Sequence, residues 1–225
     1  MRKILVTGFE PFGRDDENPT ELLARDLDGM EFNEYVVVGR VLPVSVNRSG
    51  KVLEGLLNEL KPAIAIHFGL APGLSYISVE RVAINLLDMR MPDNNGFKTE
   101  DYVIEKDAPL AYFSTLPTRK IVERLNQIGI PARLSYSAGT FLCNYILFKS
   151  LHHRAKYGYP KVSGFIHVPY LPRQVVKKHG IITRGVPSMC FENIKRAALV
   201  ALETSVEWLN GGDGAEIDLF DNSKE

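Results

Sequence analysis

The chain has 225 residues, of which 45% are hydrophobic, 24% charged and 9% aromatic, and its 27 basic side chains are balanced by 27 acidic ones. A chain of this length and composition is expected to fold as one globular domain. The zero net charge argues against binding to nucleic acids or anionic membranes, because those affinities depend on Lys and Arg facing phosphates. A small neutral substrate is easier to accommodate.

The cysteine count points to a reducing, intracellular setting. Cys143 and Cys190 are too few for a disulfide-stapled secreted scaffold, and they lack the paired spacing of a structural zinc site. The longest uncharged stretch, residues 62–79, is interrupted by glycines and a proline. Such a stretch is costly in a lipid-facing helix, so the sequence predicts no membrane segment.

Short β-branched apolar runs alternate with longer segments of helical period, which is typical of an α/β domain whose largely parallel sheet is covered by helices on both faces. The expected strands are 3–7, 35–42, 63–68, 77–85, 132–136 and 163–168. The expected helices are 19–27, 46–60, 118–128, 141–151 and 188–209, the first of them capped by Asn18. One catalytic domain is expected over residues 1–210, with a long polar loop at 88–109 and a short acidic, mobile tail over 211–225.

The loop after the first strand is the first candidate for a binding site. Its sequence, GFEPFG at residues 8–13, lacks the glycine spacing of a dinucleotide-binding loop. Two aromatic side chains on this loop, Phe9 and Phe12, suggest an apolar pocket wall. Packing in the core is the alternative for both.

Cys143 is the candidate nucleophile. It follows a strand and a turn of small residues, at the start of the expected helix 141–151. A thiol in a first helical turn lies near unpaired N–H groups and the positive end of the helix dipole, which favour the thiolate. The same N–H groups can stabilise an oxyanion. An inert buried cysteine is the alternative.

A thiolate nucleophile needs a base that later protonates the leaving amine, and histidine suits this role. His67 and His167 each close an apolar strand, where the sites of open α/β sheets gather. The pattern of residues does not separate these two. His152, His153 and His179 lie near helix ends or loops among basic residues and are expected to be solvated.

Glu80 is the candidate for the group that orients the imidazole. It falls inside the apolar strand 77–85, where an unpaired charge is expensive. A salt bridge with Arg81 or Arg90 is the alternative role for this carboxylate. No grouping of His, Cys, Asp and Glu has metal-ligand spacing, so no metal is expected.

Five blocks of sequence, in this order, resemble the pyroglutamyl peptidase I family of cytosolic cysteine peptidases, also called pyrrolidone carboxyl peptidases. The blocks are GFEPFG (8–13) with NP (18–19), ERVAIN (80–85), PDNNG (92–96), SAGTFLCN (137–144) and FIHVP (165–169). The resemblance spans nearly the whole chain. It implies a cytoplasmic exopeptidase that removes an N-terminal pyroglutamyl residue from peptides, an α/β/α sandwich fold, a homotetramer and no cofactor.

The resemblance also assigns roles to single residues. It implies that Cys143 is the nucleophile, His167 the general base and acid, and Glu80 the orienting carboxylate. By analogy it therefore selects His167 over His67.

The ring-binding aromatics of the family fall on Phe9, Phe12 and Phe141. Many members carry a Gln and an Arg in the segment where this chain has Leu70 and Leu74. A polar contact near the pocket is therefore expected to be missing, which bears on substrate affinity more than on the reaction.

Three alternatives stay open at this point. A nucleoside-processing transferase or hydrolase has a similar α/β architecture, and the polar segment 88–96 suits it. A non-catalytic binding protein is consistent with Leu70 and Leu74. Cys190, at the start of a helix, is expected to be either a packed thiol or one half of an intersubunit disulfide with its twin.

Overall fold

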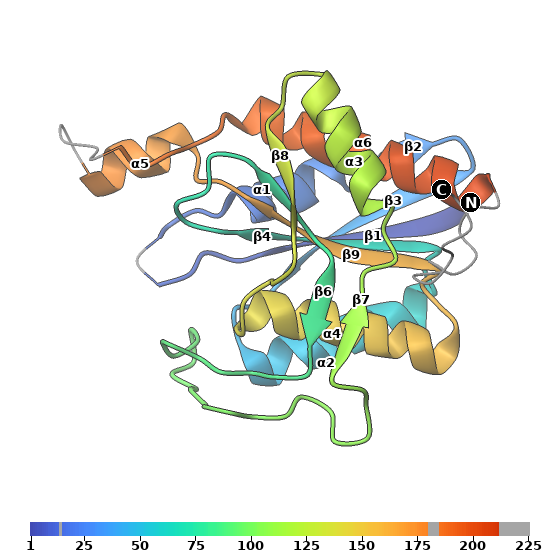
Figure 1. Ribbon diagram of the computed structural model, residues 1–225, viewed down its shortest axis with the longest axis horizontal. Coiled ribbons are helices and arrows are strands. Elements are labelled where there is room, and N and C mark those ends of the chain that lie inside the picture. Colours follow the sequence, from blue (N-terminus) through green and yellow to red (C-terminus); the bar gives the residue numbers. More distant parts are fainter. Residues whose placement is uncertain (14, 180–184, 212–225) are drawn as a thin grey trace, which may run out of the picture.

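Within residues 1–13, 15–179 and 185–211, which this computed structural model describes, seven strands form one sheet in the order β2-β3-β1-β4-β9-β5-β8 (Figure 1). The neighbours β3, β1, β4 and β9 are parallel, whereas β5 and β8 run antiparallel to β9 and β2 runs antiparallel to β3. The strands are β1 (Arg2–Phe9), β2 (Glu31–Phe32), β3 (Tyr35–Leu42), β4 (Ile64–Leu70), β5 (Ile77–Glu80), β8 (Ala132–Ser135) and β9 (Val162–Val168).

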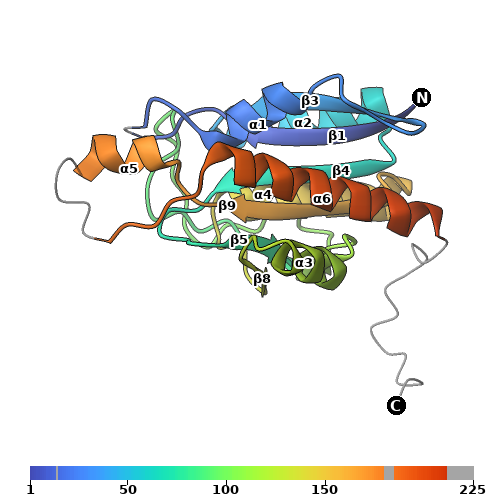
Figure 2. The ribbon, with the colours of Figure 1, turned by 90° about the horizontal axis from the view of Figure 1, so that it is seen from above.

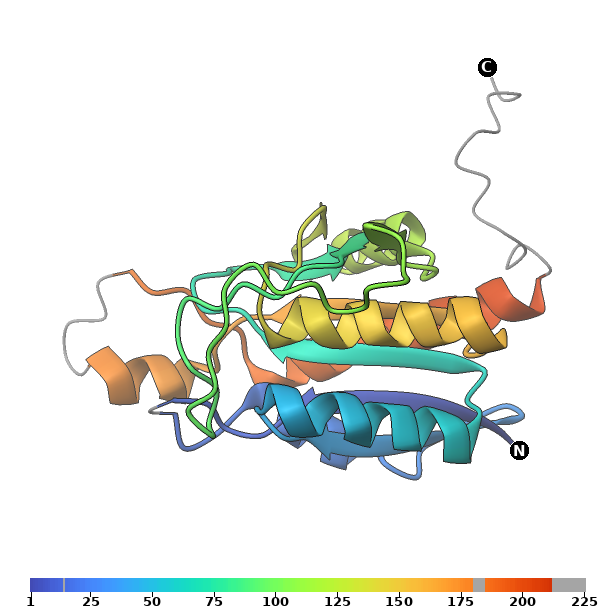
Figure 3. The ribbon, with the colours of Figure 1, turned by 90° about the horizontal axis from the view of Figure 1, so that it is seen from below.

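Helices cover both faces of this sheet. Figure 1 shows α1, α3 and α6 on one face and α2 and α4 on the other, and Figures 2 and 3 show the two faces in turn. The helices are α1 (Pro19–Leu27), α2 (Val46–Leu60), α3 (Thr118–Gln127), α4 (Leu142–Tyr157), α5 (Pro172–His179) and α6 (Phe191–Asn210). The expected α/β/α sandwich with a largely parallel sheet is confirmed.

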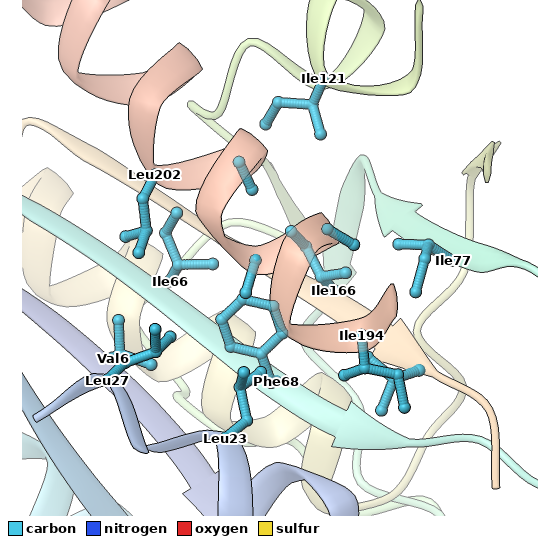
Figure 4. Packing of buried hydrophobic residues seen from close by; sticks show 14 of the residues in the cluster. Val6, Leu23, Leu27, Ile66, Phe68, Ile77, Ile121, Ile166, Ile194 and Leu202 are labelled. Carbon is cyan, nitrogen blue, oxygen red and sulfur yellow. The ribbon is translucent and has the colours of Figure 1, made fainter. Parts of the chain in front are cut away.

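The hydrophobic core lies in two layers because side chains alternate across the sheet. On one face, Val6, Ile66 and Ile166 of the strands pack against residues of α1, α3 and α6, as Figure 4 shows for part of the cluster. On the other face, strand residues such as Ala65 and Phe165 pack against α2 and α4. The second layer is the one that supports the site described below.

Helix α1 lies unusually close to the sheet, and two glycines allow this approach. A Cβ atom at Gly8 or Gly39 would lie 1.8 Å from a backbone carbonyl oxygen of α1, that of Thr20 or Ala24 respectively. The helix begins as the sequence predicts, because the Asn18 side chain accepts a hydrogen bond from the Thr20 amide at 3.0 Å. The loop that follows β1 is thereby held at the carboxyl ends of the strands.

One predicted strand, residues 77–85, is in fact two strands. The Arg81 amide donates to the Ser135 carbonyl oxygen and the Arg81 carbonyl oxygen accepts from the Ser114 amide, each at 2.8 Å. These bonds turn the chain away from β9. Beyond the turn, β6 (Val82–Ile84) pairs with β7 (Ala111–Phe113) in a separate two-stranded sheet.

The other differences concern short elements and helix ends. The sequence did not predict β2, β7 or α5, each of which is eight residues or fewer. Helix α4 continues to Tyr157, six residues past its expected end, and Gly158 in the left-handed conformation then caps it. The expected loop at 88–109 is present, and the predicted tail falls almost entirely on residues 212–225, outside the described residues. None of the helices that the structure describes is long and apolar enough to span a bilayer.

Candidate active site

Three adjacent strands present polar side chains on the face covered by α4. Strand β5 runs antiparallel to β9, with Ser78 opposite His167 and Glu80 opposite Phe165. Residues two apart on a strand share a face, so Glu80 lies diagonally across from His167. Because β5 runs antiparallel to β9, its last residue, Glu80, lies on the same face of the sheet as His167, the penultimate residue of β9.

Glu80 and His167 form a buried hydrogen-bonded pair. His167 Nδ1 lies 2.9 Å from Glu80 Oε1, and the same carboxylate oxygen accepts a hydrogen bond from Ser78 Oγ at 2.9 Å. Glu80 is 1% exposed and His167 is 8% exposed. The alternative ion pairs of Glu80 with Arg81 or Arg90 are not formed, because its partner is the imidazole.

The Cys143 thiol lies on the other side of this imidazole, at the second position of α4. Gly69 at the end of β4 makes room for it, since a Cβ atom there would lie 2.9 Å from Cys143 Sγ. Phe141 occupies the N-cap position and provides no side-chain acceptor, so the first N–H groups of the helix are free of a capping side chain. Such groups favour negative charge on a nearby atom.

The surroundings of His167 favour its protonated form. Burial alone disfavours the imidazolium, but the charge of and hydrogen bond to Cys143, and the hydrogen bond to and charge of Glu80, together raise the pKa of His167 to about 10. The imidazole of His167 therefore lies between the Cys143 thiol and the Glu80 carboxyl group, and both favour its protonated form. A cysteine, a histidine and a carboxyl group in this order are the parts that nucleophilic catalysis by a cysteine requires.

Asn144, the residue after Cys143, fixes the start of α4 on the β6 segment. Its Oδ1 accepts from the Ile84 amide, and its Nδ2 donates to the carbonyl oxygens of Ile84 and Leu86, each at 2.9 Å. One turn earlier, Thr140 exchanges two hydrogen bonds with the backbone of Asp88. Asn144 is 1% exposed, so the hydrogen bonds of its side chain are shielded from water. The position of the thiol is therefore set by a buried amide beside it.

A cavity of about 440 Å³ opens beside the thiol. The three phenylalanines singled out in the sequence, Phe9, Phe12 and Phe141, line it together with Cys143. The Phe12 and Phe141 rings pack with their centroids 5.5 Å apart. This brings all three expected aromatic residues to the same pocket as the thiol.

Phe9 is more deeply buried than the sequence suggested. It is the last residue of β1, only 4% exposed, and its ring packs against Phe165 at 6.4 Å between centroids. The sequence suggested an exposed aromatic on a loop. Phe9 is in fact both a core residue and a wall of the cavity, whereas Phe12 lies on the loop as expected.

The polar segment 92–96 supports the loop that carries Phe12. Asn94 Nδ2 donates to the Pro11 carbonyl oxygen at 2.9 Å and to Glu10 Oε1 at 3.1 Å. Asp93 Oδ2 accepts from the Val46 amide at 2.9 Å, which fixes the segment to the start of α2. The long loop thus contributes to the shape of the cavity.

The remaining histidines do not join this site. His67 lies on the same face of the sheet but is fully buried; its Nδ1 is 2.8 Å from Thr7 Oγ1, and desolvation lowers its pKa to about 3. The expectation that His153 is solvated is wrong, because it is 4% exposed under Tyr157 and Tyr159. His152 is partly buried, and the surroundings of the His179 side chain lie outside the described residues.

Several residues at the site were missed by the sequence reasoning. Ser78 lies in the expected strand 77–85 and Asn144 ends the motif SAGTFLCN, but the sequence alone indicates no role for either. Only the strand register and the helix start show what they contact. Asp15, Tyr170 and Lys178 line the same cavity and meet only in the folded chain. Leu70 also lines it, so one of the two substituted positions lies at the cavity.

Neither a metal cluster nor a disulfide is found in the described part of the chain. No group of three or more His, Cys, Asp or Glu among these residues could hold a metal ion. Cys143 is partly buried and Cys190 is exposed, and both are free thiols.

Comparison with known proteins gives one consistent result. A family model described as pyroglutamyl peptidase matches residues 2–208. The pyrrolidone-carboxylate peptidase of Pyrococcus furiosus is 56% identical over 209 residues, covering 92% of this chain and 99% of the relative. That of Thermococcus litoralis is 52% identical, covering 93% and 95% of the two chains.

Solved structures agree in fold. A mutant pyrrolidone carboxyl peptidase from Pyrococcus furiosus superposes with a TM-score of 0.89 at 55% identity, over 92% of this chain and 99% of the other. The pyrrolidone carboxyl peptidase from Thermococcus litoralis superposes with a TM-score of 0.90 at 51% identity, over 94% and 96% of the two chains.

Proposed function

The chain belongs to the pyroglutamyl peptidase family, and we propose that it hydrolyses the amide bond after an N-terminal pyroglutamyl residue with Cys143 as nucleophile. The observation that carries this proposal is the line of hydrogen-bonding groups from Glu80 through His167 to Cys143 at the wall of an aromatic cavity. The same family match favours peptidase chemistry over a nucleoside-processing transferase.

The cavity suits a pyroglutamyl ring. The lactam is compact and uncharged, so aromatic side chains can enclose it without burying an unpaired charge. Phe12 and Phe141 pack against each other at one wall, and Phe9 closes the cavity from the core side. Glutaminyl and prolyl substrates both carry a free, protonated α-amine, which would bring a charge into this apolar space, so they are disfavoured.

The proposed reaction begins from a Cys143 thiolate paired with a His167 imidazolium. Cys143 Sγ attacks the pyroglutamyl carbonyl carbon, and the free N–H groups at the start of α4 stabilise the oxyanion. The C–N bond then breaks as the His167 imidazolium gives its proton to the departing amine. Glu80 holds Nδ1 throughout and stabilises the charged ring.

The second half of the reaction releases the acyl group. With the amine gone, His167 is neutral and can take a proton from a water molecule that attacks the thioester carbonyl. The thiolate leaves, the imidazolium returns, and the products are free pyroglutamate and a peptide shortened by one residue. No further reactant is needed.

Release of a chromogenic amine from a pyroglutamyl amide tests this function. We expect Cys143→Ala to lose activity by at least about 10³-fold while the fold is kept, since the nucleophile is absent. Cys190→Ala is the matched control and should remain active. Prolyl and glutaminyl amides, assayed beside the pyroglutamyl one, should be poor substrates. Full activity of Cys143→Ala would contradict the proposal.

A homotetramer in the cytoplasm is proposed as well. It is supported by the family resemblance, by the free thiols and by large apolar side chains on the surface, among them Leu110 at 88% and Tyr136 at 64% exposure. Sedimentation at several protein concentrations tests the assembly; a monomer throughout would overturn it. A non-reducing gel tests the Cys190 cross-link, which a monomer band alone would exclude.

A further inference from the structure

The cavity beside Cys143 extends beyond the three phenylalanines. Cavities of roughly 300–1,000 Å³ typically hold drug-sized ligands, and the 440 Å³ here exceeds what one lactam ring fills. The same cavity is also lined by Leu70, Pro72 and Tyr170 and by three charged residues, Asp15, Glu17 and Lys178, of which Glu17 is paired with Arg173. Part of the peptide that follows the pyroglutamyl ring therefore has room in the same cavity.

Lys178 is held in place at this border by three contacts. Its Nζ lies 2.7 and 2.8 Å from the two carboxylate oxygens of Asp15 and 2.7 Å from the Tyr170 hydroxyl. The ammonium also sits 4.4 Å from the centroid of the Tyr170 ring. Tyr170 is 8% exposed and follows His167 by three residues, so the group is fixed to the end of β9.

This ion pair is more enclosed than its neighbour along the chain. The side chains of Lys178 and Asp15 are 30% and 14% exposed, whereas those of Lys177 and Asp16, which form the next pair, are both 65% exposed. Only the first pair lines the cavity. An ammonium has three donors, and those of Lys178 are directed at Asp15 and Tyr170, so none is left for a ligand.

We propose that Asp15 and Lys178 are specificity-determining residues that form a charge-neutral wall of the subsite for the residue after pyroglutamate. This inference rests on the proposed peptidase function and adds to it which part of the substrate the second half of the cavity receives. The paired charges cancel, and Leu70, Pro72 and the Tyr170 ring supply apolar contact. The wall therefore makes cleavage insensitive to the charge of the second residue, and removal of either charge creates a preference.

The direction of each preference follows from Coulomb's law. Lys178→Met leaves the Asp15 carboxylate without its partner, so a basic second residue is attracted and an acidic one repelled. Asp15→Asn leaves the Lys178 ammonium unbalanced and has the opposite effect. The double variant removes both charges and restores neutrality.

The experiment compares kcat/KM for three pyroglutamyl peptides that have Asp, Leu or Lys as the second residue. In Lys178→Met the ratio of the Lys to the Asp peptide should rise roughly tenfold over wild type, and in Asp15→Asn it should fall roughly tenfold. The double variant should return the ratio to within about twofold of wild type. A ratio measured on one sample does not depend on the fraction of folded protein.

The exposed pair provides the matched control. Asp16→Asn and Lys177→Met make the same charge changes one residue away and should leave the ratio unchanged. Single variants at Asp15 and Lys178 that change all three peptides equally, or controls that shift the ratio as strongly, would overturn the proposal. If the wild-type protein cleaves none of the three peptides, the proposed function itself fails, which is a different outcome from turnover with unshifted ratios.

Discussion

His67 in the middle of β4 and His167 near the end of β9 lie on neighbouring parallel strands and on the same face of the sheet. Both are buried, yet they have opposite electrostatic states. His67 has a hydroxyl partner, Thr7, and burial lowers its pKa to about 3. Burial also disfavours the charged form of His167, but Cys143 and Glu80 outweigh it and raise the pKa to about 10. The depth of a side chain therefore does not decide its charge; the chemistry of its partners does.

The same comparison explains why the two histidines could not be separated by pattern. In the sequence each follows an apolar run, and in the structure each faces the α4 side of the sheet. What distinguishes them is the strand on the far side of β9. Because β5 is antiparallel, it brings Glu80 within 2.9 Å of His167, while His67 lies one strand further away beside β1.

Substitutions of the two histidines should differ most strongly in their effect on enzymatic activity. We expect His167→Gln to lower kcat/KM by about 10³-fold or more, because the proton donor to the leaving amine is lost. His67→Gln should keep most of the activity and lose about 1–3 kcal/mol of stability, since a buried hydrogen-bonded ring is replaced. Turnover of a pyroglutamyl amide and chemical denaturation measure the two quantities. Equal loss of activity in both variants would remove the distinction.

Replacing Glu80 by Gln should make the electrostatic state of His167 more like that of His67, because the charge of its carboxylate partner is removed. Glu80→Gln keeps the shape of the side chain but should lower the pKa of His167 and reduce kcat about 10²- to 10⁴-fold. The rate of Cys143 alkylation by iodoacetamide at neutral pH should fall together with kcat, because the thiolate loses its charged partner. An unchanged alkylation rate with full activity would show that Glu80 has only a structural role.

A third, smaller effect concerns how the thiol is held beside His167. Asn144→Ala removes three buried hydrogen bonds between α4 and the β6 segment, and we expect kcat to fall about tenfold with little change in KM. Asn94→Ala, which releases the Phe12 loop instead, should raise KM more than it lowers kcat. Identical changes in both variants would argue against separate roles in positioning and binding.

The two histidines should also differ in how each one makes the free energy of unfolding depend on pH, which is a smaller effect. The pKa of His167 is raised on folding, so its contribution to stability is present below the unfolded value near 6.5 and is lost as pH rises toward about 10. The pKa of His67 is lowered on folding, so the unfolded state gains a proton first and stability falls as pH drops below about 6.5. Urea unfolding between pH 5 and 9 should show that His167→Gln flattens the alkaline side and His67→Gln the acidic side; unchanged slopes would contradict both assignments.

The local features of the fold and much of the site could be predicted from the sequence. Asn18 caps α1, as the residues that follow it indicate. Cys143 at a helix start and His167 at a strand end were likewise identified from local pattern and family motifs. These features depend on a few consecutive residues, which is why they were predictable.

The features that could not be predicted depend on long-range pairing. The turn at Arg81 arises from hydrogen bonds to Ser135 of β8 and to Ser114, which follows β7, and β5 therefore ends at Glu80. Asp15 and Lys178 are far apart in sequence and meet because α5 packs near the loop after β1 (Figure 1). Neither a composition nor a spacing rule contains that information, since it follows from the order and direction of the strands.

Trapping of the acylated protein tests directly whether Cys143 is the nucleophile. The protein is mixed with excess pyroglutamyl substrate, quenched in acid within the first turnovers and digested for mass spectrometry. We expect a pyroglutamyl adduct on the peptide that contains Cys143, and we expect it to be absent in Cys143→Ala and to accumulate in no other peptide. Rapid turnover with no adduct at Cys143, or an adduct on a different residue, would contradict it.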